Sequence, residues 1–434
     1  MGSLREDLDL RISAAADEVV EATQALVRFE TVSVDLLNDP DPDVSAEAAL
    51  QAWVAERLER CGFEVDQWEP DPKELTSPLI PSWHHWRGRP ITVGVKRGSA
   101  PGGSSLIING HVDVVAPGDP GRWTSPPFAA ELRDGRVYGR GAVDMKGGIA
   151  AALIAVEALS AHGVELRGDL IFQAVTDEEI GGMGTIAAAE RGYRADAALV
   201  PEPSGLDLWV TTRGIIHAKL EIEGRSAHAE MNQPHWRDGG GVNAAHKAIA
   251  IARELIALGD SWSRDPERAH PLVSPPGLHV TSIHGGSYIA NIPESCELLV
   301  NATYAPSQGG GREVRVEMEQ AVERACEGDD WLQASPPSWT WMLDYPSSEI
   351  DAGAGIVAAA QAAARRVGGG GQLVGLDSGF DGALLSTIYG IPSPAFGPGD
   401  LRRAHATDEW VGVAELVDAA RAYAQVIVDW CGVG

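Results

Sequence analysis

The sequence is poor in lysine, in cysteine and in long apolar runs, and each shortage excludes a class of protein. Only five of the 34 basic residues are lysine, and 62 acidic residues give a net charge of −28, which disfavours nucleic acid and anionic membranes as partners. The four cysteines form no CxxC pair, which argues against a disulfide framework. The N-terminus lacks an apolar signal core, and no apolar run reaches membrane-spanning length. We therefore expect a soluble cytoplasmic protein.

What is present is a chain of 434 residues with enough apolar side chains, 44%, to fill the cores of two domains. Apolar residues recur at helical spacing over 13–28 and 45–60, and an Ala-rich helix is predicted over 147–160. Short apolar runs predict buried strands at 91–95, 106–108, 170–175 and 197–200. The Pro-rich stretch 69–90 is typical of a long surface loop. This alternation of strands and helices predicts an α/β sandwich with a largely parallel sheet.

The pattern changes after Thr212. Strands are predicted at 215–223, 278–283 and 297–304, and helices at 242–258 and 313–327. This β-α-β-β-α segment is compact enough to form an inserted domain over 213–328. The first domain would then consist of residues 1–212 and 329–434, with further helices near 353–366 and 414–429.

A set of histidines and carboxylates follows the predicted strands. Its members are His111 and Asp113 in NGHVDVV, Asp144 in GRGAVDMKGG, Glu178 and Glu179 in VTDEEIGG, Glu202 in VPEPS, and His405 in AHATDEW. Each has an ordinary alternative when taken alone: a polar loop, a helix N-cap or a solvated turn. Together, two imidazoles and three further carboxylates can hold two metal ions and leave one carboxylate as a base. The set therefore favours a two-metal hydrolase.

The ordered motifs resemble those of the di-zinc aminoacylase/carboxypeptidase family, which includes acetylornithine deacetylase and succinyl-diaminopimelate desuccinylase. The resemblance runs from about residue 13 to 430 and also includes WTSPPF, GRSAHA, NIP and FGPGD. It implies a zinc-hydrolase three-layer sandwich with an inserted ferredoxin-like α+β domain, which acts as a lid and dimerisation domain. A homodimer is thus expected.

The resemblance also implies a role for each residue. One zinc ion would be bound by His111 and Glu202, the other by Glu179 and His405, with Asp144 between the two ions. Asp113 would orient His111, and Glu178 would be the general base that activates the water and later protonates the leaving amine. Co²⁺ or Mn²⁺ could occupy the same ligands. The bond between Asp144 and Met145 is expected to be cis.

In the inserted domain, His228 resembles a histidine that reaches the active site of the partner subunit and stabilises the oxyanion. Asn291 resembles a substrate-binding residue. The family commonly has an arginine that binds the substrate carboxylate at the position of Thr303. Either another arginine, such as Arg213 or Arg225, replaces it, or the substrate has no carboxylate there.

The expected activity is hydrolysis of the amide of a small N-acyl amino acid or a related N-acylated amine. The alternatives are a carboxypeptidase or dipeptidase, and a deformylase-like amidase acting on an amine that is not an amino acid. A metal-free binding protein with the same fold is disfavoured, because every expected ligand and the base are present in the sequence.

Overall fold

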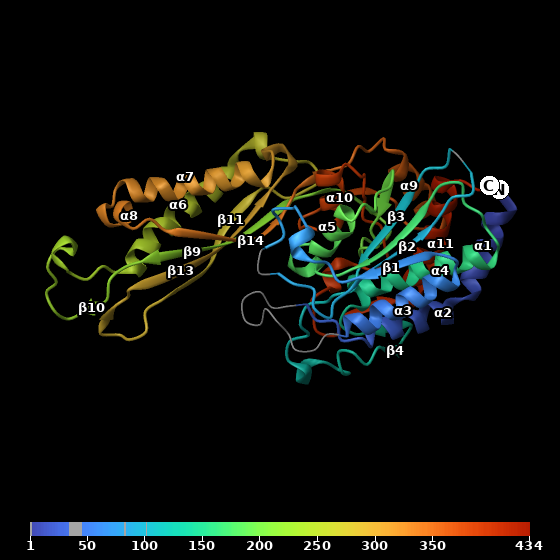
Figure 1. The fold of residues 1–434 in the computed structure, drawn as a ribbon, viewed down its shortest axis with the longest axis horizontal. Helices are drawn as coiled ribbons and strands as arrows, with labels where there is room; N and C mark the ends of the chain where they lie inside the picture. The colour runs from blue at the N-terminus through green and yellow to red at the C-terminus, as the bar shows by residue number, and fades with distance from the viewer. Residues whose placement is uncertain (1, 34–45, 82–83, 101) are drawn as a thin grey trace. The chain divides into compact units, whose positions relative to one another are not determined.

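The computed structural model describes residues 2–33, 46–81, 84–100 and 102–434 (Figure 1). The chain divides into two compact units. The first unit consists of Met1–Val210, Glu349–Gly375 and Phe380–Gly434, and the second consists of Thr211–Ser348 with Leu376–Gly379. The second unit is thus an insertion in the first. It ends at Ser348 rather than at the expected residue 328, because a strand at 338–345 pairs with its sheet.

A five-stranded sheet, in the order β1-β2-β6-β3-β7, lies at the centre of the first unit. Its strands are β1 (Glu64–Trp68), β2 (Ile91–Lys96), β3 (Leu106–His111), β6 (Leu170–Val175) and β7 (Ala197–Leu199). The expectation of a largely parallel sheet was wrong. β3 is parallel to β6 and β7, but β2 is antiparallel to both β1 and β6. No crossover helix is found in the described part of the 69–90 connection, so β2 returns antiparallel beside β1.

Helices cover both faces of this sheet and make a three-layer sandwich (Figure 1). Apolar side chains such as Val93 and Ile171 pack against α5 (Met183–Glu190) and α10 (Asp381–Tyr389). The opposite face contacts α3 (Glu47–Arg60) and α4 (Gly147–Ala161), where Gly94 lies beside Leu58. The remaining helices of this unit are α1 (Gly2–Ala14), α2 (Ala16–Val27), α9 (Gly355–Arg366) and α11 (Val413–Cys431).

Two three-stranded sheets are found in the described residues besides the two main sheets. One has the order β17-β5-β4, and the other β15-β8-β16. Their strands are β4 (Glu131–Arg133), β5 (Arg136–Tyr138), β8 (Leu208–Thr212), β15 (Ser348–Glu349), β16 (Leu373–Leu376) and β17 (Trp410–Gly412). Among the helices of the described ranges, none combines the length and apolarity needed to cross a bilayer.

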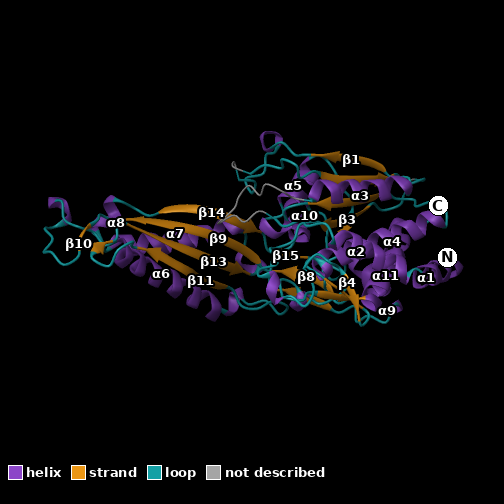
Figure 2. Cartoon of the chain, turned by 90° about the horizontal axis from the view of Figure 1, so that it is seen from below, coloured by secondary structure: helices purple, strands orange, loops and turns teal. Residues whose placement is uncertain are grey.

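The second unit is a four-stranded antiparallel sheet with two long helices on one face (Figure 2). The strands β9 (Gly214–Glu223), β11 (Gly277–Gly285), β13 (Ser295–Tyr304) and β14 (Ser338–Tyr345) occur in the order β11-β13-β9-β14. Buried and partly exposed residues alternate along β9 and β13, so one face of each strand packs against α6 (Ala244–Arg264) and α7 (Gly311–Glu327). The short elements α8 (Asp330–Ala334), β10 (Ala227–His228) and β12 (Asn291–Ile292) complete this ferredoxin-like α+β unit.

Candidate metal centre

The predicted ligands lie at the carboxyl ends of parallel strands in the first unit. β3 ends at His111 itself, β6 is followed by the turn Glu178–Ile180, and β7 is followed by Glu202. Because the carboxyl ends of parallel strands share one edge of a sheet, these side chains meet there. Asp144 joins them from the turn before α4, and its peptide bond to Met145 is cis, as the resemblance implies.

Five of the predicted residues form two groups of possible metal ligands that share one member. His111, Asp144 and Glu202 form the first group, and Asp144, Glu179 and His405 form the second; within each group the donor atoms lie within 4.8 Å of one another. His111 Nε2 is 3.3 Å from Asp144 Oδ1 and 3.7 Å from Glu202 Oε1. His405 Nε2 is 3.5 Å from Asp144 Oδ2. The two oxygens of Asp144 therefore face different groups.

Asp113 contacts both His111 and the turn that carries Glu178. His111 Nδ1 lies 2.9 Å from the backbone carbonyl of Asp113, and 3.6 Å from its carboxylate. The carboxylate instead accepts the backbone N–H groups of Glu178 and Glu179, each at 3.2 Å. Asp113 thus contacts His111 through its main chain and holds the Glu178–Ile180 turn through its side chain. Burial, reinforced by nearby carboxylates, raises the pKa of Asp113 to about 7.

Glu178 lies beside the first group, with a carboxylate oxygen 4.0 Å from His111 Nε2. Burial raises the pKa of Glu178 well above its usual value, and the charges of Glu202 and Glu179 add to this effect. Burial likewise raises the pKa of Glu202, together with the charge of Asp144. Burial lowers the pKa of His111, but its carboxylate neighbours more than offset this and hold the pKa well above its usual value. The cluster thus holds more negative than positive groups, a field that favours cations.

A buried network under Glu178 was not found from the sequence. The neighbouring residue, Asp177, is fully buried; its carboxylate lies 3.0 Å from His84 Nε2 and also pairs with Arg89, which in turn binds Glu47 at 3.0 Å. Burial raises the pKa of Asp177, but the effect of Arg89 and His84 is larger, and the net result is a pKa lowered to about 2. The network ties the end of the 69–90 loop and the start of α3 to the turn that carries Glu178. Its only signal in the sequence is an Asp before the two glutamates.

The other predicted site residues lie in the second unit. His228 and Asn291 are directly opposite each other in the antiparallel pair β10–β12, and the ring of His228 is oriented by the backbone N–H of Glu230, 3.3 Å from Nδ1. Thr303 lies on β13, and its hydroxyl donates to the carbonyl of Gly277 at 3.5 Å. A cavity of about 560 Å³ is lined by Thr303, Arg213 and neighbouring residues of the same unit.

Both arginines that could replace the expected one are engaged by backbone carbonyls. Arg213 donates from Nε and Nη2 to the carbonyl of Asp377, at 3.2 and 2.7 Å, and from Nη1 to that of Pro275 at 3.1 Å. Arg225 donates from Nη1 to the carbonyls of Trp236 and Gly240 and lies over the ring of Trp331. These guanidinium groups hold loops of their own unit together.

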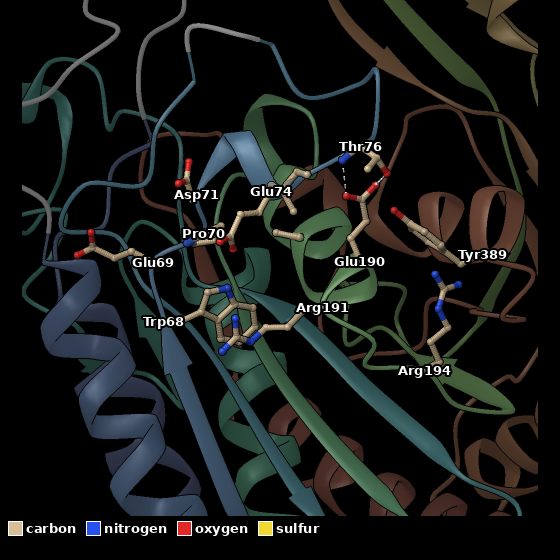
Figure 3. Close-up of a pocket in the computed structure, with 12 residues that line it drawn as sticks. Trp68, Glu69, Pro70, Asp71, Glu74, Thr76, Glu190, Arg191, Arg194 and Tyr389 are labelled. Atoms are coloured by element: carbon tan, nitrogen blue, oxygen red, sulfur yellow. Dashed lines mark hydrogen bonds between the residues drawn. The ribbon is translucent and has the colours of Figure 1, made fainter.

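A separate cavity of about 700 Å³ in the first unit has a different character (Figure 3). Its charged groups are largely paired with one another or with neighbours. Glu190 accepts from the backbone N–H and the hydroxyl of Thr76, and Arg191 binds Asp66 and stacks on Trp68. None of the five ligand residues lines this cavity. The carboxylate cluster at the strand ends is therefore the candidate site.

Comparison with known proteins identifies the family of this chain. The sequence model of peptidase family M20/M25/M40 matches residues 107–429. The chain belongs to this family. A curated relative of this M20 protein is the N-formyl-4-amino-5-aminomethyl-2-methylpyrimidine deformylase of Bacillus subtilis (strain 168). The two are 30% identical over 441 residues, which cover 98% of this chain and 97% of the relative.

Solved structures share the fold of this M20 protein. The dipeptidase Dug1p of Saccharomyces cerevisiae has a TM-score of 0.74 at 16% identity and covers 99% of both chains. A dinuclear metal binding peptidase of the M20 family from Bacillus subtilis has a TM-score of 0.60 at 16% identity, covering 96% of this chain and 98% of that chain. At these identities the likeness shows the two-unit α/β fold.

The donor set of this M20 protein fits metal ions. Imidazole nitrogen and carboxylate oxygen are ligands that divalent transition metals accept, and each group supplies three donors, which leaves room for water or substrate. A cation in each group would offset the excess of carboxylates, whose charges add to burial in raising the pKa of Glu178 and of Glu202. The family and the relative agree with this donor set: the protein is a metal-dependent amide hydrolase.

The shared position of Asp144 leads to a prediction about metal content. Asp144→Asn should lose both ions, because each group loses a charged ligand, whereas His405→Ala should lose one. The measurement is metal per chain by plasma mass spectrometry after zinc reconstitution and desalting. Asp400→Asn, in the same loop as His405 but bonded to Arg402, is the control and should keep the wild-type content. Two ions per chain in Asp144→Asn would contradict the assignment.

Proposed function

We propose that this chain is a two-zinc hydrolase that removes the formyl group from a small N-formylated amine without an α-carboxylate. Water adds to the formyl carbon, the C–N bond breaks, and formate and the free amine leave. The relative that is 30% identical along nearly the full length of both chains is named for a reaction of this class, on an aminomethyl-pyrimidine. Amino-acid deacylases and dipeptidases act on the same bond type but need a means of holding a carboxylate.

The observation that carries this choice is the absence of an available guanidinium at the expected place. The family resemblance puts a carboxylate-binding arginine at Thr303, and a hydroxyl cannot form the bidentate pair that a guanidinium makes. Arg213 lines the same cavity as Thr303, but its donors are bonded to the carbonyls of Asp377 and Pro275. A substrate carboxylate would have to break these bonds, so a substrate without one is favoured.

The residues of the first unit have separate proposed roles, and five of them would bind the metal ions. His111 with Glu202 would hold one zinc ion and Glu179 with His405 the other, with Asp144 contacting both. When bound, the ions polarise the formyl carbonyl and lower the pKa of water. Zinc suits these nitrogen and oxygen ligands, and Co²⁺ or Mn²⁺ can occupy them as well.

Glu178 is the proposed proton carrier. Its carboxylate lies beside His111 and is not a member of either ligand group, so it can take a proton from the attacking water and return it to the amine nitrogen. Asp113 fixes the position of the Glu178 backbone by accepting its N–H.

The substrate assignment predicts an order of rates. The zinc enzyme should hydrolyse N-formyl-aminomethyl-pyrimidine with a kcat/KM about 100-fold or more above that for N-formyl amino acids, N-acetyl amino acids or dipeptides, because those substrates would bury an unpaired carboxylate. Release of formate and of free amine measures the rates. Faster cleavage of any carboxylate-bearing substrate would show that the choice is wrong.

Variants sharpen this test. Thr303→Arg should raise the relative rate on N-formyl amino acids, whereas Thr281→Arg, on the neighbouring exposed strand β11, should not. Glu178→Gln should lose roughly 10²–10⁴-fold in kcat while keeping its metal, because only proton transfer is removed.

We further propose that the chain forms a homodimer through the second unit. β11 is an edge strand of the sheet, and edge strands tend to pair with another chain. Ile249 and Ile256, two turns apart on α6, and Ile283 on β11 are each between 44% and 51% exposed, which is unusual for isoleucine. In such a dimer, His228 of one subunit would serve the site of the other by donating to the carbonyl oxygen as negative charge develops there. Asn291, opposite His228, would contact the substrate.

The dimer is tested with two matched substitutions. Ile249→Glu should give a monomer in light scattering and lose activity while keeping its metal, because a charge is placed in the interface. Ile388→Glu, on α10 of the first unit and 42% exposed, should remain dimeric and active. Mixed dimers of His228→Ala and Glu178→Ala subunits should recover activity that neither variant has alone. A dimeric Ile249→Glu protein would contradict the proposed interface, and inactive mixed dimers would contradict the proposed role of His228.

The chain is also proposed to work in the cytoplasm. All four of its cysteines are free thiols, as expected in a reducing compartment.

A further inference from the structure

Glu409 lies four residues after His405, just before β17, and its side chain is buried against the segment that carries Asp144. Its Oε1 accepts the backbone N–H groups of Val143 and Asp144, at 2.9 and 3.3 Å. Its own backbone carbonyl accepts the N–H of Gly139 at 2.9 Å. One residue of the His405 loop therefore binds the Asp144 segment at three places.

Arg140 holds the other carboxylate oxygen of Glu409. Its Nη1 donates to Oε2 at 2.5 Å, and both side chains are 3% exposed or less. The guanidinium also lies over the ring of Trp123 and donates from Nη2 to the carbonyl of Ala116. Since both side chains are buried, the Glu409 carboxylate does not form its hydrogen bonds with bulk water. Its orientation is fixed by Arg140 on one side and by two N–H groups on the other.

The backbone at Asp144 needs such a partner. Asp144 and Met145 have non-helical backbone angles, with φ −122° and ψ 97° at Asp144, although helix α4 begins two residues later. The N–H groups of Val143 and Asp144 bond to Glu409 rather than to a helical carbonyl. The direction of the Asp144 side chain follows from the orientation of this peptide segment.

Glu409 itself is not in a position to bind metal. It belongs to neither ligand group, and its two oxygens are occupied by three donors. An effect of Glu409 on the geometry of the ligands would therefore pass through the segment that carries Asp144 or through the loop of His405.

We propose that Glu409, held by Arg140, is a positioning residue that fixes Asp144 relative to His405, so that the affinity for metal depends on a carboxylate that is not a ligand. The inference rests on the proposed metal role of Asp144, and not on the identity of the substrate. Both groups share Asp144, so loss of Glu409 weakens both ions together.

The test compares Glu409→Gln and Arg140→Met with a matched control, Glu415→Gln. Glu415 also joins an arginine to a backbone N–H, because it binds Arg403 at 2.9 Å and the N–H of Gly412 at 2.8 Å, but it contacts no ligand residue. Dissociation constants for Zn²⁺ are measured by competition with a chromogenic chelator. The visible spectrum of the Co²⁺-substituted protein reports ligand geometry, and the melting temperature of the metal-free protein reports the fold.

Both test variants should bind Zn²⁺ roughly 10–100-fold more weakly than wild type, and their Co²⁺ spectra should be altered. At saturating metal, kcat should fall while KM stays near the wild-type value. The double variant should be little worse than either single one, because the two residues act as one unit. Glu415→Gln should bind Zn²⁺ as wild type does.

Wild-type Zn²⁺ affinity and an unchanged Co²⁺ spectrum in the folded Glu409→Gln protein would overturn the proposal. This holds even if its melting temperature were lower, because a residue with a purely structural role would lower only the melting temperature. Arg140→Met keeps the carboxylate but frees it, so it decides the question if Glu409→Gln does not fold. If wild type itself bound no divalent ion, the proposed metal centre would fail together with this inference. Metal binding without deformylase activity would leave this inference standing and refute only the substrate.

Discussion

The two oxygens of Asp144 face two different sets of ligands, and the arrangement of the first unit depends on this sharing. His111 lies beside one oxygen and His405 beside the other, and Glu202 and Glu179 complete the two groups, so several carboxylates gather around only two imidazoles. Carboxylates packed this closely repel one another and are stable only when protons or cations neutralise them. Burial and the neighbouring carboxylate charges raise the pKa of both Glu178 and Glu202. Bound metal ions would neutralise these carboxylates and leave Glu178 able to accept a proton.

Each ligand is supported by residues that are not ligands. Asp113 holds the turn of Glu178 and Glu179 through two N–H groups, and Asp177, the residue before this turn, is anchored by Arg89 and His84. These buried ion pairs cost free energy to desolvate, and they persist because every member has a partner. What they provide is a fixed geometry at the ends of three strands. The chemistry therefore belongs to the first unit, while the choice of substrate is proposed to lie with Thr303 of the second.

The sequence was sufficient for the parts of the structure that depend on local pattern. The strand predicted at 170–175 has these bounds in β6, and the predicted helix over 147–160 is α4, which ends one residue later. His111, Glu179 and Glu202 could be grouped because each follows an apolar run, and strand ends of one sheet meet. Asp144 and His405 were added through the family motifs. The direction of β2 could not be predicted, since it depends on how the Pro-rich 69–90 connection returns. Strand β14 was missed because its inner residues include Trp339 and Trp341 in a mixed, half-exposed pattern.

The contacts of Asp113 and Glu409 lay further beyond the sequence. Both carboxylates bind backbone N–H groups of remote segments. Every residue except proline has such a group, so the sequence does not indicate which N–H a carboxylate will bind. In the sequence, Glu409 is part of the AHATDEW motif, in which only the histidine is an expected metal ligand. Likewise, only the hydrogen bonds of Arg213 to the carbonyls of Asp377 and Pro275 show that its guanidinium binds backbone groups of its own unit.

The most direct test of the account is anomalous scattering at the zinc absorption edge from crystals of the zinc-loaded protein. The account predicts two peaks roughly 3.5–4 Å apart. One should lie beside His111 and Glu202, the other beside Glu179 and His405, and the carboxylate of Asp144 should contact both. A single peak, or two peaks of which neither contacts Asp144, would contradict it.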